Sequence, residues 1–202
     1  MSSSSVTALI SKRIHDIPLG KPFLTKDFLD LGDRAAVDKA LGRMVDKGLL
    51  VRLARGIYTK PKSGVYVKQV KPSPEAVARA VVESNDSDIA YDGAKALQLL
   101  GLTTQEPVQP IFVTNGPSRN FKYGNFQIRL KHVRRMPIGL NGRAALAYSA
   151  FLYLGKDQAT SEMLSGVLTR FSPEELQSLM DARKSMPSWF SSLLRKVGTR
   201  TS

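Results

Sequence analysis

Nine residues between positions 25 and 60 carry groups that could bind the phosphates or the base edges of a nucleic-acid duplex. Lysine and arginine neutralise phosphates and release their counterions, and arginine also pairs bidentately with guanine. A residue at the start of a helix lies where phosphates bind well. Duplex DNA is therefore the ligand that this spacing predicts. The predicted DNA-binding residues are Thr25, Lys26, Arg34, Lys39, Arg43, Lys47, Arg52, Arg55 and Lys60.

A short helix over residues 26–31 is the first element expected to position these groups. Thr25 is placed to cap it, because a threonine side chain can accept from the first free backbone N–H groups of a helix. Phe28, Leu29 and Leu31 would face inward. Thr25 and Lys26, at the helix start, are the expected backbone clamps.

The second predicted helix begins after Asp33 and ends at Gly48. Asp33 suits the N-cap, and Gly48 suits a left-handed C-terminal position. Apolar residues recur along it at steps of three and four, which predicts one buried stripe. These residues are Ala36, Val37, Ala40, Leu41, Met44 and Val45. The remaining face carries cations, so this is the predicted recognition helix.

The roles of these cations follow from their position along the recognition helix. Arg34 and Lys39 lie in the half that reaches base edges, with Arg34 the first choice for direct readout. Arg43 and Lys47 lie nearer the phosphates. The alternative is that this face is only a solvated surface, as most basic helix faces are.

A basic hairpin is predicted after this helix. Residues 49–53 and 57–59 are rich in apolar and β-branched side chains and flank Ala54-Arg55-Gly56. A helix over residues 6–14, buried through Leu9, Ile10, Ile14 and Ile17, completes a three-helix core. This order predicts a winged helix-turn-helix, which in a minority of cases serves only as a protein-docking module.

Two prolines in Lys71-Pro72-Ser73-Pro74 mark the expected boundary between a DNA-binding domain (1–71) and a C-terminal domain (72–202). Helices are expected over 74–83 and 93–100, and strands over 64–71, 111–114 and 126–130. Four further helices are expected over 143–154, 161–170, 173–184 and 189–197. The fold class is therefore α+β, with an N-terminal winged helix and a mixed C-terminal domain that ends in helices.

A second basic surface is predicted from Arg119, Lys122, Arg129, Lys131, Arg134 and Arg135. Phe121, Tyr123 and Phe126 are interleaved with these cations and could stack on unpaired bases, so RNA or an acidic protein is the corresponding partner. The favoured interpretation is that the aromatics are core residues and the cations cover a sheet edge.

Composition agrees with a polyanionic partner. The 202 residues carry a formal net charge of +13, and the excess of cations per residue is greater over 1–71 than over 72–202. There is no cysteine, no apolar run long enough for a membrane span and no signal-peptide pattern, so we expect a cytoplasmic protein without a membrane partner.

Catalysis is not expected. The histidines, His15 and His132, stand in no metal-ligand or triad spacing, and the chain offers no phosphate loop ending in Gly-Lys-Ser/Thr. We therefore predict no catalytic residue, no metal and no cofactor.

The order of motifs resembles the AbiEi-type antitoxins of type IV toxin–antitoxin systems over residues 7–135. The resemblance depends on the Arg55-Gly56-Ile57-Tyr58 hairpin, the segment YDGAKALQLLGLTTQ (91–105) and the strand PIFVTNG (110–116). It implies a winged helix that binds inverted repeats in its own promoter and represses its operon. It also implies a C-terminal domain that counteracts a nucleotidyltransferase-like toxin. The alternative is a stand-alone winged-helix regulator, or a nucleic-acid-binding protein, without a toxin partner.

Overall fold

The computed structural model describes residues 5–62, 70–134, 140 and 142–198. The chain divides into two compact units. Unit 1 contains residues 1–87 and 120–128, and unit 2 contains residues 88–119 and 129–202. Unit 1 therefore extends past the boundary predicted at residue 71. The predicted strand over 64–71 lies almost wholly outside the described residues, and Val70 and Lys71 are not in a strand.

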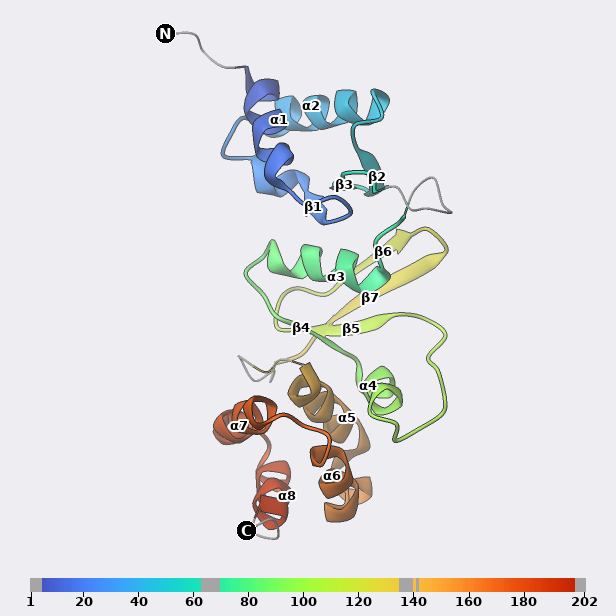
Figure 1. Ribbon diagram of the computed structural model, residues 1–202, viewed down its shortest axis with the longest axis vertical. Helices are drawn as coiled ribbons and strands as arrows, with labels where there is room; N and C mark the ends of the chain where they lie inside the picture. Colours follow the sequence, from blue (N-terminus) through green and yellow to red (C-terminus); the bar gives the residue numbers. More distant parts are fainter. Residues whose placement is uncertain (1–4, 63–69, 135–139, 141, 199–202) are drawn as a thin grey trace. The chain divides into compact units, whose positions relative to one another are not determined.

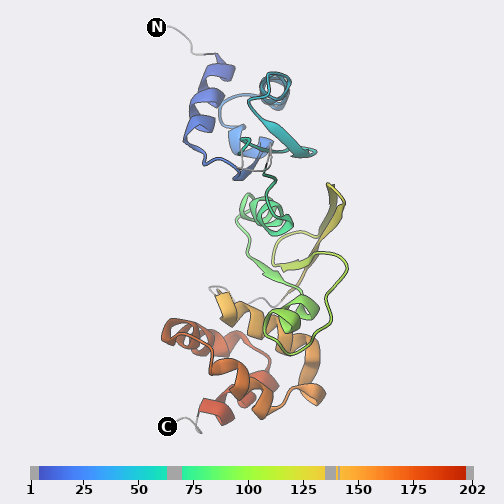
Figure 2. The same cartoon turned by 45° about the vertical axis from the view of Figure 1, so that its right-hand side comes forward.

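The elements of unit 1 before residue 88 are α1 (Val6–Asp16), β1 (Pro22–Leu24), the 3₁₀ helix η1 (Thr25–Phe28), α2 (Arg34–Asp46), β2 (Val51–Ala54), β3 (Ile57–Thr59) and α3 (Pro74–Glu83). Helices α1 and α2 lie side by side, and the three strands form a small sheet (Figure 1 and Figure 2). The sheet has the order β1-β3-β2, with both pairs antiparallel. Strand β1, which pairs with β3, was not expected from the sequence.

Helix α2 begins and ends where its capping residues predict. The Asp33 carboxylate accepts the Ala36 N–H at 2.8 Å. Gly48 follows the helix with a φ of 71°, which a residue with a side chain adopts only at a cost. The predicted apolar stripe is the buried face, since Val37, Ala40 and Leu41 are fully covered.

The core of unit 1 gathers apolar residues from α1, β1, η1, α2 and β3, together with Leu50 just before β2: Ile10, Ile14, Phe23, Phe28, Val37, Ala40, Leu41, Met44, Leu50 and Tyr58. Two predictions about this core are wrong. Leu9 and Leu29 remain 38% and 40% exposed, respectively. The helix predicted over residues 26–31 forms only the four-residue η1, so Leu29 falls after its end and is exposed.

An ion pair ties α1 to the segment before α2. The Arg13 guanidinium donates to both Asp30 carboxylate oxygens at 2.7 Å, and this hydrogen bonding holds the pKa of Asp30 below its ordinary value. The same guanidinium lies 5.9 Å from the centroid of the Phe28 ring. Arg13 therefore serves the packing of the three helical segments.

Unit 2 combines strands with a helical C-terminal part. Its elements, with the hairpin partly shared with unit 1, are β4 (Ile89–Tyr91), α4 (Gly93–Leu99), β5 (Ile111–Thr114), β6 (Arg119–Tyr123), β7 (Phe126–His132), α5 (Gly142–Gln158), α6 (Ser161–Leu168), α7 (Pro173–Asp181), η2 (Ala182–Ser185) and α8 (Ser188–Gly198). The strand order is β4-β5-β7-β6, and β5 and β7 are parallel. The α+β class is confirmed.

Strand β7 is buried on one face only, as its alternation predicts. Ile128 and Leu130 are 0% and 2% exposed, whereas Gln127, Arg129 and Lys131 are exposed. Phe126, expected inside with them, is 46% exposed because it begins the strand at the hairpin tip. Strands β4 and β6 were not predicted.

The C-terminal helices form the core of unit 2 around Phe151, Leu164, Leu179, Phe190 and Leu194. Ser172 and Glu175 make a capping box at the start of α7. Helix α7 ends at Asp181, three residues before the predicted end, and continues as η2. No helix within the described residues combines the length and apolarity needed to cross a bilayer.

Candidate nucleic-acid interface

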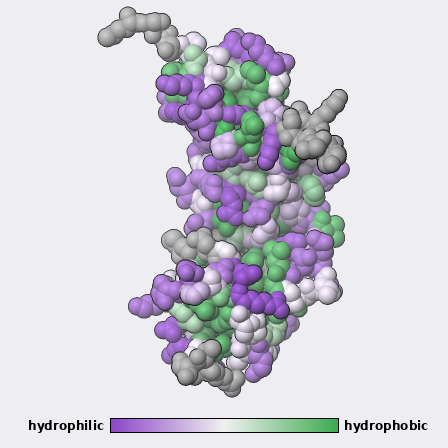
Figure 3. Space-filling view, in the orientation of Figure 1, coloured by the Kyte–Doolittle hydropathy of each residue, from purple (hydrophilic) through white to green (hydrophobic). Residues whose placement is uncertain are grey.

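One stripe of α2 is exposed at Ala35, Lys39 and Asp46 and half-buried at Gly42. Ala35, Lys39, Gly42 and Asp46 follow one another at steps of three and four residues, opposite the buried stripe. Two of the four are small, and a Cβ added at Gly42 would meet nothing within 4 Å. A rod-like partner could therefore approach the backbone of α2 closely, with Lys39 as the central cation. Hydrophilic side chains gather over α2 in Figure 3.

Arg34 lies at the start of α2 and borders the hairpin turn. Its Nε donates to Asp38 Oδ2 at 2.9 Å, one helical turn along, and the side chain remains 60% exposed. A Cβ built at Gly56 would lie 3.9 Å from Arg34 Nη2. An exposed pair of this kind contributes only about 0.3–0.5 kcal/mol, so a base edge could displace Asp38 at little cost.

The β2–β3 turn brings a further cation to the same end of α2. Arg55 is exposed at the turn, and Gly56 has a φ of 74°. The turn is anchored to η1, since the Thr25 N–H donates to the Gly56 carbonyl at 3.1 Å. Arg52 lies on the preceding strand with its guanidinium 6.0 Å from the Tyr58 ring centroid.

Thr25 itself is 1% exposed. Its hydroxyl is buried without a hydrogen-bond partner among the described residues. A phosphate outside the protein cannot reach this side chain while unit 1 keeps this conformation. Thr25 positions the hairpin turn through its backbone N–H, and its side chain is too buried to contact DNA.

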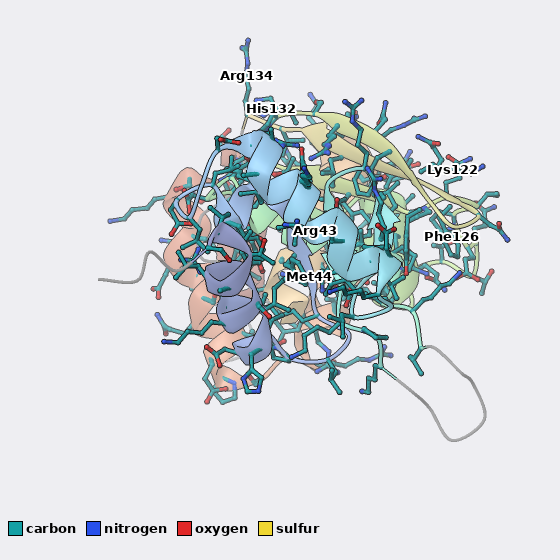
Figure 4. The ribbon with its side chains drawn as sticks, turned by 90° about the horizontal axis from the view of Figure 1, so that it is seen from above. Arg43, Met44, Lys122, Phe126, His132 and Arg134 are labelled. Carbon is teal, nitrogen blue, oxygen red and sulfur yellow. The ribbon has the colours of Figure 1, made fainter. Side chains whose placement is uncertain are left out.

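Three predicted DNA-binding cations are bound within unit 1. The Lys26 ammonium donates to the Ser84 carbonyl and, at 2.9 Å, to Asn85 Oδ1. The Lys60 ammonium donates to the His15 carbonyl at 2.8 Å. Arg43 Nη2 donates to Thr7 Oγ1 at 2.7 Å and so links α2 to α1. Figure 4 labels Arg43 beside the buried Met44.

The other predicted cations are freer. Within the part of the chain that the structure describes, Lys39, Lys47 and Arg55 are exposed and have no hydrogen bond or ion pair. An unpaired exposed cation gives up only water when it meets a phosphate, so its charge is fully available. We call Arg34, Lys39, Arg43, Lys47 and Arg55 the basic face of unit 1.

The second basic surface is divided between the units. Lys122 belongs to unit 1, and Arg119, Arg129, Lys131 and Arg134 belong to unit 2. All five are exposed, and Arg135 lies outside the described residues. Figure 4 shows Lys122 and Phe126 at the tip of the β6–β7 hairpin and Arg134 projecting outward.

The aromatic residues between these cations have different surroundings. Tyr123 is 5% exposed and donates its hydroxyl to the Pro72 carbonyl at 2.7 Å, and burial raises its pKa. Phe121 is half-buried. Only Phe126 offers an open ring, so the hairpin does not present the row of aromatics that stacking on several unpaired bases needs.

The two histidines lie apart from any cluster of metal-ligand residues. His15 is exposed beside Asp16, and His132 Nδ1 lies 2.9 Å from the Gly116 carbonyl oxygen. Among the described residues, no three His, Cys, Asp or Glu side chains come together as a metal site would require.

Two features of the basic face were not predicted from the sequence. The small residues Ala35 and Gly42 lie on its accessible side, and their spacing of seven residues, two helical turns, could have indicated this. The proximity of Gly56 to Arg34 depends on the pairing of β1 with β3, and no local pattern predicts it.

A family model described as "Family of unknown function (DUF6088)" matches residues 9–176. No curated protein matches the chain. Among solved structures, the chain is similar to the RV2827C protein from Mycobacterium tuberculosis, with 13% sequence identity and a TM-score of 0.44. That match covers 93% of this chain and 80% of the other.

Proposed function

The chain belongs to the DUF6088 family, whose function is unknown, and we propose that it binds double-stranded DNA through a winged helix-turn-helix in unit 1. One observation carries the proposal. No described residue pairs with Lys39 on the accessible side of α2 or with Arg55 at the adjacent hairpin turn, and this is where a winged helix meets its duplex.

In this proposal, η1 and α2 are the helix-turn-helix, and the β2–β3 hairpin is the wing. Helix α2 enters the major groove with Ala35 and Gly42 toward the bases, because small side chains let the helix sit deep. Arg34 exchanges Asp38 for a guanine edge, and Lys39 contacts bases or phosphates beside it. Arg55 reaches the phosphates that flank the groove.

In this proposal, the remaining cations do not read the DNA sequence. Arg43 and Lys47 contact the sugar–phosphate backbone and fix the register of α2 without reading sequence. Arg52 lies farther from the turn than Arg55 and adds charge to the wing. Lys26 and Lys60 hold unit 1 together through their carbonyl contacts, so they act on binding through the shape of the interface.

We further propose that this binding represses transcription of the protein's own operon, on the model of the AbiEi-type antitoxins that the sequence resembles. The function then takes place in the cytoplasm, where the DNA is. In that arrangement the C-terminal domain counteracts a nucleotidyltransferase-like toxin encoded beside it. The resemblance of residues 91–105 and 110–116 supports this part of the proposal.

A gel-shift assay tests the DNA-binding proposal. The full chain is titrated against a duplex from its own upstream region and against a duplex with the same base composition in shuffled order. We expect the upstream duplex to bind at least tenfold more tightly at physiological salt, since base readout adds to the shared phosphate contacts. Failure of both duplexes to bind at low salt would refute the proposal.

A co-expression assay separates an antitoxin from a stand-alone regulator. A neighbouring nucleotidyltransferase-like gene is induced in cells with and without this chain. Rescue of growth by an Arg34→Ala, Lys39→Ala and Arg55→Ala variant, which should not bind the promoter, would assign neutralisation to a surface other than the basic face. Absence of a toxic neighbour, or of rescue by the wild type, would leave a regulator without a toxin partner.

A further inference from the structure

A pocket of about 250 Å³ lies within unit 2, between the sheet and α5. Half of its lining residues are aliphatic, and Tyr148, Ser149 and Tyr153 also line it. Ala90, Val113 and Val133 contribute from the strands or just beyond them, and Ala145 and Leu152 contribute from α5, with Leu140 beside them. Lys131 and Asp92 also line it and, among the described residues, are its only charged side chains. The DNA-binding proposal uses none of these residues.

The pairing of three strands explains how Lys131 reaches the pocket. Ala90 pairs with Val113, and Val113 pairs with Lys131, so the three residues form one row across β4, β5 and β7. Paired residues on adjacent strands project to the same face of a sheet. The aliphatic part of the row forms the floor, and the lysine stands at its end.

Gly93 fixes the opposite side of the pocket. A Cβ added there would come within 2.8 Å of the Ser149 carbonyl oxygen and would overlap the Tyr153 side chain. Only glycine therefore lets the start of α4 lie against α5 at this point. The Asp92-Gly93 pair therefore closes the pocket between the end of β4 and α5.

The two charges at the pocket are not equivalent. The Asp92 carboxylate caps α4 and accepts the Ala94 N–H at 3.4 Å. The Lys131 ammonium has no hydrogen bond or ion pair with any residue that the structure describes, Asp92 included. The pocket therefore offers a ligand one uncommitted cation beside an apolar wall.

We propose that this pocket binds a small carboxylic acid with an apolar body, whose carboxylate pairs with Lys131. Its volume lies below the roughly 300–1,000 Å³ of pockets for drug-sized ligands, which limits the ligand to on the order of ten non-hydrogen atoms. An apolar body replaces water at the aliphatic part of the wall, whereas a free phosphate would lose hydration there. An amine would have to take Asp92 from its capping position.

The test compares three probes of matched shape with the full chain: 3-phenylpropanoate, the neutral 3-phenylpropanamide and the cationic 3-phenylpropylamine. Binding is measured from amide chemical-shift changes in ¹H–¹⁵N spectra. We expect 3-phenylpropanoate to shift the amides of residues 90, 113 and 133 in a saturable way. The amide should bind about tenfold more weakly, because a charge-assisted hydrogen bond exceeds a neutral one by roughly that ratio.

Two variants assign the effect to the pocket. Lys131→Met keeps the aliphatic stem and should weaken 3-phenylpropanoate about tenfold while leaving 3-phenylpropanamide unchanged. Lys122→Met is the matched control on β6, outside the pocket, and should change neither affinity. Ala145→Leu fills the pocket and should abolish binding of all three probes, with an unchanged melting temperature as the check on folding.

Equal affinity for the three probes, tighter binding of the amine, or no saturable shift at millimolar 3-phenylpropanoate would each overturn the proposal. So would an equal loss in Lys131→Met and Lys122→Met. None of these outcomes depends on DNA, so failure here and failure of the proposed function are separate results.

Discussion

Unit 1 and unit 2 each present lysines that no described residue neutralises, but in opposite surroundings. Lys39 lies on the accessible side of a helix, beside small residues and within reach of other cations. Lys131 lies at the edge of a partly aliphatic pocket, where Asp92 is the only other charge that the described residues bring to the wall. A convex row of cations matches an extended polyanion, whereas one cation beside a concave apolar wall matches a single small anion.

The comparison shows that the chemistry of a cation is decided by what surrounds it. Both lysines belong to basic clusters in the sequence, and charge alone would give them the same partner. Burial, pairing and the shape of the neighbouring backbone separate them. Substitutions in one unit should therefore change the binding or stability of that unit and leave the other unit unaffected.

The largest effect should come from removing the two unpaired cations that flank Arg34. A Lys39→Ala and Arg55→Ala variant should lose DNA affinity by about 30-fold, with the salt slope reduced by about two units. Its affinity for 3-phenylpropanoate should not change. Fluorescence anisotropy at two or more salt concentrations measures the DNA affinity and its salt slope.

The control for this variant is Lys156→Ala with Lys184→Ala, which removes the same net charge from exposed positions of unit 2. It should leave DNA affinity within about twofold, because neither lysine belongs to the basic face of unit 1. Equal losses in the two double variants would show that total charge, and not the basic face, determines binding.

A smaller effect is expected at Arg43, which bonds to Thr7 and also belongs to the basic face. Arg43→Ala should weaken binding to all DNA sequences about fivefold and reduce the salt slope by about one unit. Thr7→Val removes the same 2.7 Å hydrogen bond and keeps the charge. Anisotropy titrations should therefore find normal affinity for Thr7→Val, and a matching loss would reassign Arg43 to structure alone.

Stability should respond in opposite directions to the same substitution at two glycines of unit 1. Gly42→Ala should raise the free energy of unfolding by about 0.5–1 kcal/mol, since the residue is helical and the added methyl group meets nothing. Gly48→Ala should lower it by about 1 kcal/mol, because Gly48 has a φ of 71°. Urea unfolding measures both, and a stabilising Gly48→Ala would contradict the helix end.

The smallest expected effect is the pH dependence of unit 2 at Glu175. Backbone N–H groups of Arg143 and Ser172 donate to this carboxylate and lower its pKa from the ordinary 4.5. A carboxylate with a lowered folded-state pKa adds stability above its unfolded pKa and loses it as the pH falls through the folded value. Glu175→Gln should therefore flatten the acid limb of the unfolding profile below about pH 4.5. An unchanged acid limb would contradict this assignment.

Local patterns predicted much of the fold. Helix α3 and strand β5 have the boundaries expected from the sequence, and α2 has its predicted caps. Each of these elements is predicted by a local signal of a few residues: a capping residue, a proline or a β-branched run. The short strands β1, β4 and β6 were missed, because three to five residues owe their conformation to a partner strand distant in sequence.

The candidate sites also combine features that local sequence patterns predict with features that depend on distant contacts. The cations of α2 follow from helical periodicity, so the basic face could be anticipated. That Lys26 and Lys60 bond to distant carbonyls, or that Thr25 is buried, could not. The pocket was invisible in the sequence because its floor joins residues 90, 113 and 131 through strand pairing.

Mapping the DNA contact surface by amide chemical shifts decides whether unit 1 or the second basic surface binds the duplex. The ¹⁵N-labelled full chain is titrated with a duplex from its own upstream region. The largest changes should fall on residues 34–47 and 54–57, with the amides around Lys131 unaffected. Changes concentrated on residues 119–134, with those of α2 unmoved, would contradict the assignment of DNA binding to unit 1.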